Sequence, residues 1–132
     1  MKKYRLKKID CIMYYVSDLK EAAQFYEEVL GLKRGWTDTD EKMIGFLFPE
    51  SNSEIVLHSN TSLKNPDINY QVENVEEFCR YIRKEGYEIE LEPMNVRCGK
   101  FAILKDPYGN RIPIIDLTKF HGTPRYDNNI PP

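Results

Sequence analysis

The chain contains one pattern of segments twice, at an offset of about 56 residues. A strand-like run over 9–16 leads into a helical segment that ends at Gly31, and a second run over 67–72 leads into one that ends at Gly86. An internal repeat constrains a fold more than a single motif does, because each copy must form the same supersecondary unit. The chain is therefore expected to be two copies of one strand–helix–strands module.

Both predicted helices begin with the same local chemistry. Asp18 is followed three positions later by Glu21, and Asn74 by Glu77, which is the capping-box pattern of a helix N-terminus. Apolar residues then recur at helical spacing, and a glycine supplies the left-handed stop at the end of each helix. Two helices, one in each module, are the expected result.

The remaining segments show the alternation and the turn residues of β-strands. The expected strands are 9–16, 33–38, 43–48, 54–59, 67–72, 87–92, 100–105 and 110–116. The predicted fold class is α+β, with two βαβββ modules that form a curved mixed sheet around a central cleft and carry their helices on the outer face. One domain, 1–117, holds modules of roughly 8–60 and 64–117, and 118–132 form a C-terminal tail that is either disordered or packed on a neighbouring surface.

Composition excludes several classes of partner. The net charge is −2, so the chain lacks the basic surface that nucleic-acid binding needs. Its apolar runs are far shorter than a membrane span, so no membrane partner is expected. The three cysteines, Cys11, Cys79 and Cys98, lie in unrelated contexts and cannot all pair. Reduced thiols in a cytoplasmic protein are the simplest interpretation.

Strand parity separates two faces of the predicted sheet, because alternate residues point to opposite sides. One face is uniformly apolar and should hold the helices, whereas the other is mixed polar and aromatic and suits the lining of a cleft. The residues predicted to line the cleft are Cys11, Met13, Tyr15, Trp36, Glu54, Val56, His58, Asp67, Asn69, Phe101, Arg111 and Pro113.

Two signatures in the chain resemble those of the vicinal oxygen chelate superfamily, which includes glyoxalase I, fosfomycin- and bleomycin-resistance proteins and extradiol dioxygenases. They are Val16-x-Asp18-Leu19 with Phe25-Tyr26 and Leu30-Gly31, and Pro93 with Gly99-Lys100-Phe101 and Asp106-Pro107-Tyr108-Gly109-Asn110. Together they span nearly all of 8–116. The resemblance implies the paired-module fold and a homodimer. It does not specify a reaction, since one scaffold serves many chemistries.

The resemblance also implies where a divalent metal would bind. Glyoxalase-like relatives take one ligand from the first and last strand of each module, and those positions fall on Cys11, Val56, Asp67 and Pro113. Valine and proline side chains carry no lone pair, and a soft thiolate matches poorly with a hard carboxylate. Catalytic single-metal sites normally keep at least three protein ligands. We therefore expect no metal and no other cofactor, with a bound divalent metal as the alternative.

Several polar residues leave alternatives open. Cys11, Asp67 and either His58 or Glu54 could form a displaced metal site, although polar side chains at a cleft rim are the simpler explanation, because a metal needs several ligands. Asp67 is the one candidate for a general base, if the cleft desolvates its carboxyl group. The alternative is that it binds a cationic or hydroxylated ligand at the mouth of the cleft. Cys11 is expected to fill space as a small apolar residue, because nothing nearby in sequence would lower the pKa of its thiol.

The aromatic residues favour a ligand-binding function. Tyr15, Trp36 and Phe101 would stack on a flat molecule, while Arg97 and Arg111 are candidate contacts for an anion. The main hypothesis is a protein that binds a small, aromatic or apolar molecule without the four-ligand metal site; whether it catalyses a reaction stays open. The alternative is a divalent-metal-dependent lyase or dioxygenase with a rearranged site. A third hypothesis is a protein-interaction module that uses the tail.

Overall fold

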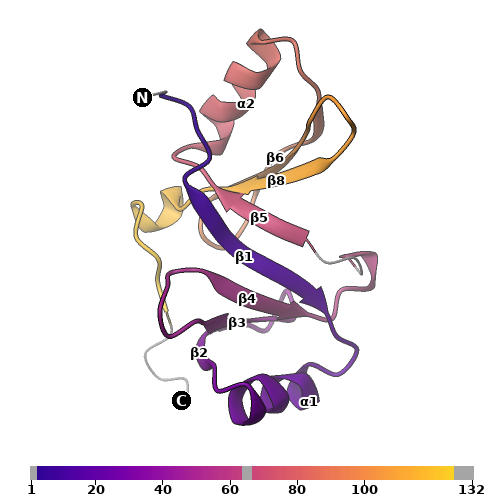
Figure 1. Ribbon diagram of the computed structural model, residues 1–132, viewed down its shortest axis with the longest axis vertical. Coiled ribbons are helices and arrows are strands. Elements are labelled where there is room, and N and C mark those ends of the chain that lie inside the picture. The colour runs from indigo at the N-terminus through magenta and orange to yellow at the C-terminus, as the bar shows by residue number, and fades with distance from the viewer. Residues whose placement is uncertain (1–2, 64–66, 127–132) are drawn as a thin grey trace. The chain divides into compact units, whose positions relative to one another are not determined.

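A computed structural model of the chain describes residues 3–63 and 67–126 (Figure 1). The first series of elements is β1 (Lys8–Tyr15), α1 (Leu19–Gln24), β2 (Lys33–Asp38), β3 (Met43–Leu47) and β4 (Glu54–His58). The second series is β5 (Asp67–Gln71), α2 (Val75–Lys84), β6 (Ile89–Asn95), β7 (Lys100–Lys105) and β8 (Arg111–Ile115). The predicted α+β fold of two βαβββ modules is therefore confirmed.

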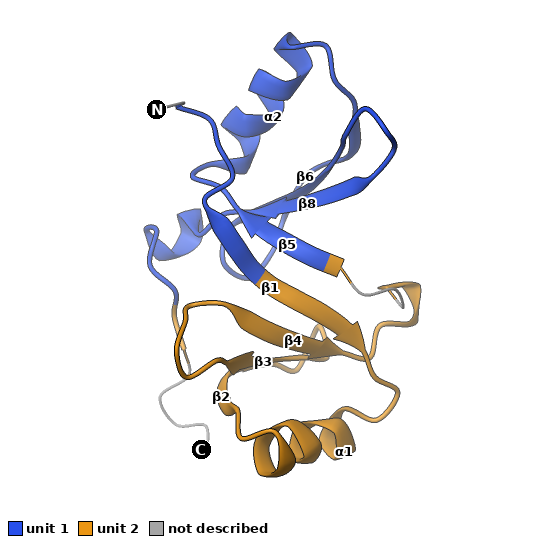
Figure 2. Ribbon diagram, in the orientation of Figure 1, with its two compact units in different colours: residues 1–10, 68–124 blue, residues 11–67, 125–132 orange. Residues whose placement is uncertain are grey.

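The chain divides into two compact units, drawn in different colours in Figure 2. Among the described residues, unit 1 holds 3–10 and 68–124, and unit 2 holds 11–63, 67 and 125–126. The units follow the two modules except at the chain ends. The N-terminal residues pack with the second module, and residues 125–126 pack with the first.

In unit 2 the strands follow the order β2-β3-β4-β1, with β1 parallel to β4 and the other neighbours antiparallel. Helix α1 covers one face of this sheet. The buried side chains between them are Ala23, Ile44, Phe46 and Leu57. This is the apolar face that strand parity assigned to the helices, and we refer to the opposite side as the helix-free face of unit 2.

Helix α1 begins as predicted but ends differently. The Glu21 amide donates to the Asp18 carboxylate at 3.0 Å, as the capping pattern requires. After Gln24 the helix widens into a π-helical segment, η1 (Phe25–Val29), in which the Leu30 amide donates to the Phe25 carbonyl. The sequence predicted one regular helix up to Leu30. The wider turn rotates the last side chains away from the apolar stripe, and Val29 is 67% exposed.

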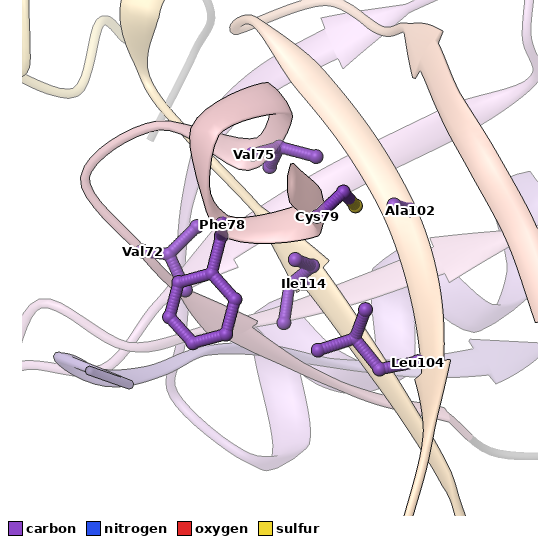
Figure 3. Close-up of a cluster of buried hydrophobic side chains, with 7 residues drawn as sticks. All are labelled: Val72, Val75, Phe78, Cys79, Ala102, Leu104 and Ile114. Atoms are coloured by element: carbon purple, nitrogen blue, oxygen red, sulfur yellow. The ribbon is translucent and has the colours of Figure 1, made fainter. Parts of the chain in front are cut away.

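In unit 1 the strand order is β5-β8-β7-β6, with β5 parallel to β8. Helix α2 is capped by Asn74, whose side chain accepts from the Glu77 amide at 2.9 Å. Figure 3 shows the core between α2 and this sheet. Its buried residues are Val72, Val75, Phe78, Cys79, Ala102, Leu104 and Ile114. No helix in the described part of the chain is long and apolar enough to cross a membrane.

Strand β6 lies further along the chain than predicted. The turn signals placed it at 87–92, whereas it spans Ile89–Asn95 and includes Pro93. Its register with β7 shifts twice, between Ile89 and Leu91 and between Leu91 and Met94. Proline lacks the amide that an inner strand needs, but an irregular strand at the edge of a sheet tolerates it. The edge position of β6 explains the difference.

Asp116 joins three parts of unit 1. One carboxylate oxygen accepts from the Lys100 amide at 2.9 Å and from both the amide and the hydroxyl of Thr118, and the other accepts from the Val75 amide at 2.7 Å. The side chain is completely buried. A β-carbon on Gly99 would overlap this carboxylate, so the glycine in the Gly99-Lys100-Phe101 signature leaves room for it.

The first residues of the predicted tail pack against unit 1. They form a short helix, η3 (Thr118–Phe120). The Lys119 amide donates to the Cys98 carbonyl at 3.0 Å, and the Arg97 guanidinium lies 5.0 Å from the centre of the Phe120 ring. The last part of the tail, 127–132, lies outside the described residues.

Candidate ligand-binding face

The parallel pairing of β1 and β4 determines which predicted site residues are neighbours in unit 2. Cys11 lies beside Glu54, Met13 beside Val56, and Tyr15 beside His58. The intervening residues of β4, Ile55 and Leu57, pack toward α1, so these three pairs belong to the helix-free face. The family pattern placed a ligand position at Val56, but the residue beside Cys11 is Glu54.

A β-bulge in β2 directs Trp36 onto this face. Arg34 pairs with Phe46 and Trp36 pairs with Gly45, so that Gly35 is the extra residue. The Arg34 guanidinium lies 6.0 Å from the Phe46 ring centre, on the helix side. Without a bulge, residues two apart point to the same side of a strand. The inserted residue instead sends Trp36 to the side opposite Arg34.

The indole of Trp36 lies across Gly45 and reaches the next strand. Its Nε1–H donates to a carboxylate oxygen of Glu54 at 2.7 Å. A β-carbon on Gly45 would overlap the indole ring, so only glycine leaves space for it at this position. An isolated glycine inside a predicted strand indicates such a close approach, and this signal in the sequence could have identified Gly45.

Apolar side chains complete the floor and the edge of the face. Cys11, Trp36 and Val56 form one buried cluster and are 3–8% exposed. Met13 and Met43 pack against the cluster and are only partly buried. The face therefore presents a fixed aromatic and aliphatic floor beside flexible methionines, a combination that accommodates apolar groups of varied shape.

His58 is completely buried on the same face. Its Nδ1 accepts from the Asn60 amide at 3.2 Å, and its ring lies 6.0 Å from that of Tyr15, edge to face. Because Nδ1 is the acceptor, the neutral imidazole carries its proton on Nε2. Burial lowers the pKa of His58, while the Asp67 carboxylate and the Leu63 carbonyl act in the opposite direction.

The four positions that the family uses for a metal do not fit one in this chain. Val56 and Pro113 offer no donor atom. Glu54, the neighbour of Cys11 in the sheet, already accepts a hydrogen bond from the indole N–H of Trp36. Among residues 3–63 and 67–126 no three His, Cys, Asp or Glu side chains are grouped as metal ligands. We therefore derive no chemical step through a metal.

The predicted site residues of unit 1 share the face of its sheet that α2 leaves uncovered. Ile114 points into the α2 core, so its strand neighbour Pro113 lies on the opposite side, where it pairs with Ile103. Asn69 is 3% exposed on β5. Arg111 is exposed and binds Glu90 at 2.9 Å through its Nε–H, so its charge is engaged by a carboxylate.

Phe101, also on the uncovered face of unit 1, pairs with Ile115 across β7 and β8 and is half-buried. A shallow hollow elsewhere in unit 1 includes none of the predicted site residues. Tyr4 in this hollow stacks on Tyr81 at 4.8 Å, and Lys7 binds Glu73 at 3.1 Å. Because this ion pair and the stacked rings already occupy the hollow, we do not treat it as a binding site.

Comparison with known proteins identifies the fold. The profile of the family described as Glyoxalase/Bleomycin resistance protein/Dioxygenase superfamily matches residues 8–114. No curated protein matches the chain. A solved structure of methylmalonyl-CoA epimerase from Mycobacterium tuberculosis is 18% identical, with a TM-score of 0.68 over 88% of this chain and 91% of that chain.

Two further solved structures are similar. A glyoxalase/bleomycin resistance protein/dioxygenase superfamily member from Vibrio splendidus is 14% identical, with a TM-score of 0.58 over 85% of this chain and 99% of that chain. A hypothetical protein from Bacillus halodurans is 19% identical, with a TM-score of 0.63 over 96% of this chain and 100% of that chain. At these identities the likeness concerns the fold alone.

Proposed function

Because the chain belongs to the Glyoxalase/Bleomycin resistance protein/Dioxygenase superfamily, whose fold alone does not specify a reaction, we propose its function from the residues of the site. The protein binds a small, flat, aromatic or apolar molecule on the helix-free face of unit 2. It does so without the four-ligand metal site, because two of the four positions are Val56 and Pro113.

The observation that carries this proposal is the placement of Trp36. The bulge turns the indole onto the face, Gly45 leaves space for it, and Glu54 holds its N–H. The indole is 8% exposed and forms the floor of the face, and a ring fixed in this way has little rotational entropy left to lose when a ligand packs over it. Met13 and Met43 beside it supply an adaptable apolar border.

Thermal-shift and fluorescence measurements test the proposal. Trp36 is the only tryptophan, so its emission reports directly on this face. We expect planar aromatic antibiotics, with bleomycin among them, or glutathione conjugates to change the emission and to raise the melting temperature. Trp36→Leu should weaken binding by roughly fivefold, since an aromatic contact is worth about 1 kcal/mol. Tyr108→Leu, at a side chain that is 90% exposed on unit 1, is the matched control.

Two results would overturn the proposal. One is that no compound in the panel changes either signal. The other is that the purified protein contains stoichiometric nickel, zinc, iron or manganese that is lost with Asp67→Ala. In the second case the function would be that of a divalent-metal-dependent lyase or dioxygenase with a rearranged site. The observation that favours this alternative is the electrostatic effect of Asp67 on His58.

A metal titration separates the two functions. The alternative predicts that divalent metals raise the melting temperature of the protein and that Asp67→Asn abolishes the rise. Asp40→Asn, at an exposed carboxylate, is the control. If nickel, zinc, iron and manganese all leave the melting temperature unchanged, the metal-dependent function is rejected.

We also propose that the protein is a cytoplasmic homodimer. The dimer is an expectation from the family, and light scattering during gel filtration tests it.

Burial raises the pKa of Cys79 to about 11 and that of Cys98 to about 12, so both thiols stay protonated and unreactive at neutral pH. Titration of the unfolded protein with a thiol reagent should detect all three cysteines. Fewer reactive thiols would contradict a reducing location.

A further inference from the structure

Tyr126, in the C-terminal segment, lies against the bulge of β2. Its ring carbon Cδ1 is 3.1 Å from the position that a β-carbon on Gly35 would occupy. The Leu47 side chain approaches the same position, with Cγ at 3.0 Å. Gly35 is buried, so the backbone of the bulge is enclosed between these two side chains.

The contact falls on the helix-free face of unit 2. Leu47 pairs with Glu54, which binds the Trp36 indole, so Leu47 belongs to this face. A bulge places two residues of one strand opposite a single residue of its partner, and here Gly35 and Trp36 stand opposite Gly45. Tyr126 therefore packs on the residue directly before Trp36, on the side to which Trp36 points.

We propose that Tyr126 is a positioning residue for Trp36, and that Tyr126 is thereby a part of the ligand-binding face. The Tyr126 ring presses on Gly35 and keeps the bulge in the conformation that turns the indole across Gly45. Glycine has the widest backbone freedom of any residue, so a bulge built on it needs an external contact to hold one conformation. Removing the ring frees the bulge, and the indole then loses its fixed orientation.

This inference rests on the proposed function only in treating the face of Trp36 as the ligand-binding face. Its test needs no ligand, since acrylamide quenching of Trp36 fluorescence measures how well the indole is enclosed. Trp36 is 8% exposed. We expect Tyr126→Ala to raise the quenching constant by roughly twofold and to shift the emission to longer wavelength, because a lost ring opens the packing around the indole.

Two variants distinguish positioning from a general loss of stability. Tyr126→Phe keeps the ring and should restore the quenching constant of the original protein. Tyr108→Ala removes an equally large ring from an exposed turn of unit 1 and should leave Trp36 unchanged. Far-ultraviolet circular dichroism checks that each variant is folded.

Gly35→Ala provides an independent measurement should Tyr126→Ala fail to fold. The added β-carbon would press on both Leu47 and Tyr126, and should also raise the quenching constant. An unchanged quenching constant in folded Tyr126→Ala, or in Gly35→Ala, would overturn the inference. Quenching that rises in Tyr126→Phe as much as in Tyr126→Ala would overturn it too, because the ring would then not be the positioning element. Failure of the ligand titration alone would reject the proposed function and leave this inference standing.

Discussion

Asp116→Asn should destabilise the protein strongly although it changes the shape of one side chain very little. The carboxylate is fully buried and accepts four hydrogen bonds, three of them from backbone amides. An amide group carries one oxygen where the carboxylate has two. The NH₂ group of the new asparagine must therefore point either toward the amide of Val75 or toward the amides of Lys100 and Thr118. In both orientations a donor faces another donor, and no hydrogen bond can form between them.

The size of the effect follows from the bonds that are lost. In the least disruptive orientation only the bond from the Val75 amide, at 2.7 Å, is broken. A hydrogen bond to a charged group contributes about 1.5–3 kcal/mol, and a buried donor without an acceptor costs about 1–3 kcal/mol. Since the two estimates overlap, we expect a loss of about 3 kcal/mol in the free energy of unfolding. For 132 residues this lowers the melting temperature by roughly 10 °C.

Urea denaturation followed by circular dichroism measures the loss, with Asp40→Asn as a control for the same change at an exposed carboxylate. The midpoint of Asp116→Asn should fall while the slope of the transition stays constant. A destabilisation below about 1 kcal/mol would refute the reasoning, because it would mean that water or a small rearrangement satisfies the amides at no cost.

Three further predictions concern other positions. Gly45→Ala should destabilise the protein by about 1–3 kcal/mol and shift the emission of Trp36, because a β-carbon overlaps the indole. Asn74→Ala should remove the cap of α2 and lower the free energy of unfolding by about 1 kcal/mol in urea denaturation. His58→Gln should flatten the acid side of the stability–pH curve. Burial lowers the pKa of folded His58, so its contribution to stability is present above pH ~6.5 and is lost as the pH falls below that value.

Each of these predictions has its own contradicting result. Gly45→Ala with unchanged emission and stability would mean that the indole does not lie across β3. A helix that tolerates Asn74→Ala without loss would show that its cap bond contributes nothing. For His58 the contradicting result is an acid side of the curve that stays as steep in His58→Gln as in the original protein, because the pH dependence would then not come from His58.

Local chemistry in the sequence was sufficient to predict the elements of both modules. Asp18 and Asn74 cap their helices as expected, because a capping residue needs only the amides of its own first turn. Gly31 and Gly86 have φ of 72° and 89°, the left-handed conformation that ends a helix. These interactions are complete within a few residues, so the pattern of the sequence determines them.

Interactions between distant strands were harder to predict. The bulge at Gly35 reverses the side to which Trp36 points, and parity alone would have placed Arg34 and Trp36 on one face. The register of β1 with β4 brings Glu54 beside Cys11. Both features depend on how two strands pair across the sheet, which neither strand specifies by itself.

The sequence by itself determined that this protein is built from two βαβββ modules with capped helices. It also predicted, through the resemblance, that two of the four metal-ligand positions fall on Val56 and Pro113. Repeats, caps and missing donor atoms are properties of single residues and their near neighbours. Only the tertiary structure decided that Trp36 lies across Gly45 to Glu54, and that Tyr126 packs beside it on the bulge. Those contacts join four separate segments of the chain, and packing in three dimensions selects them.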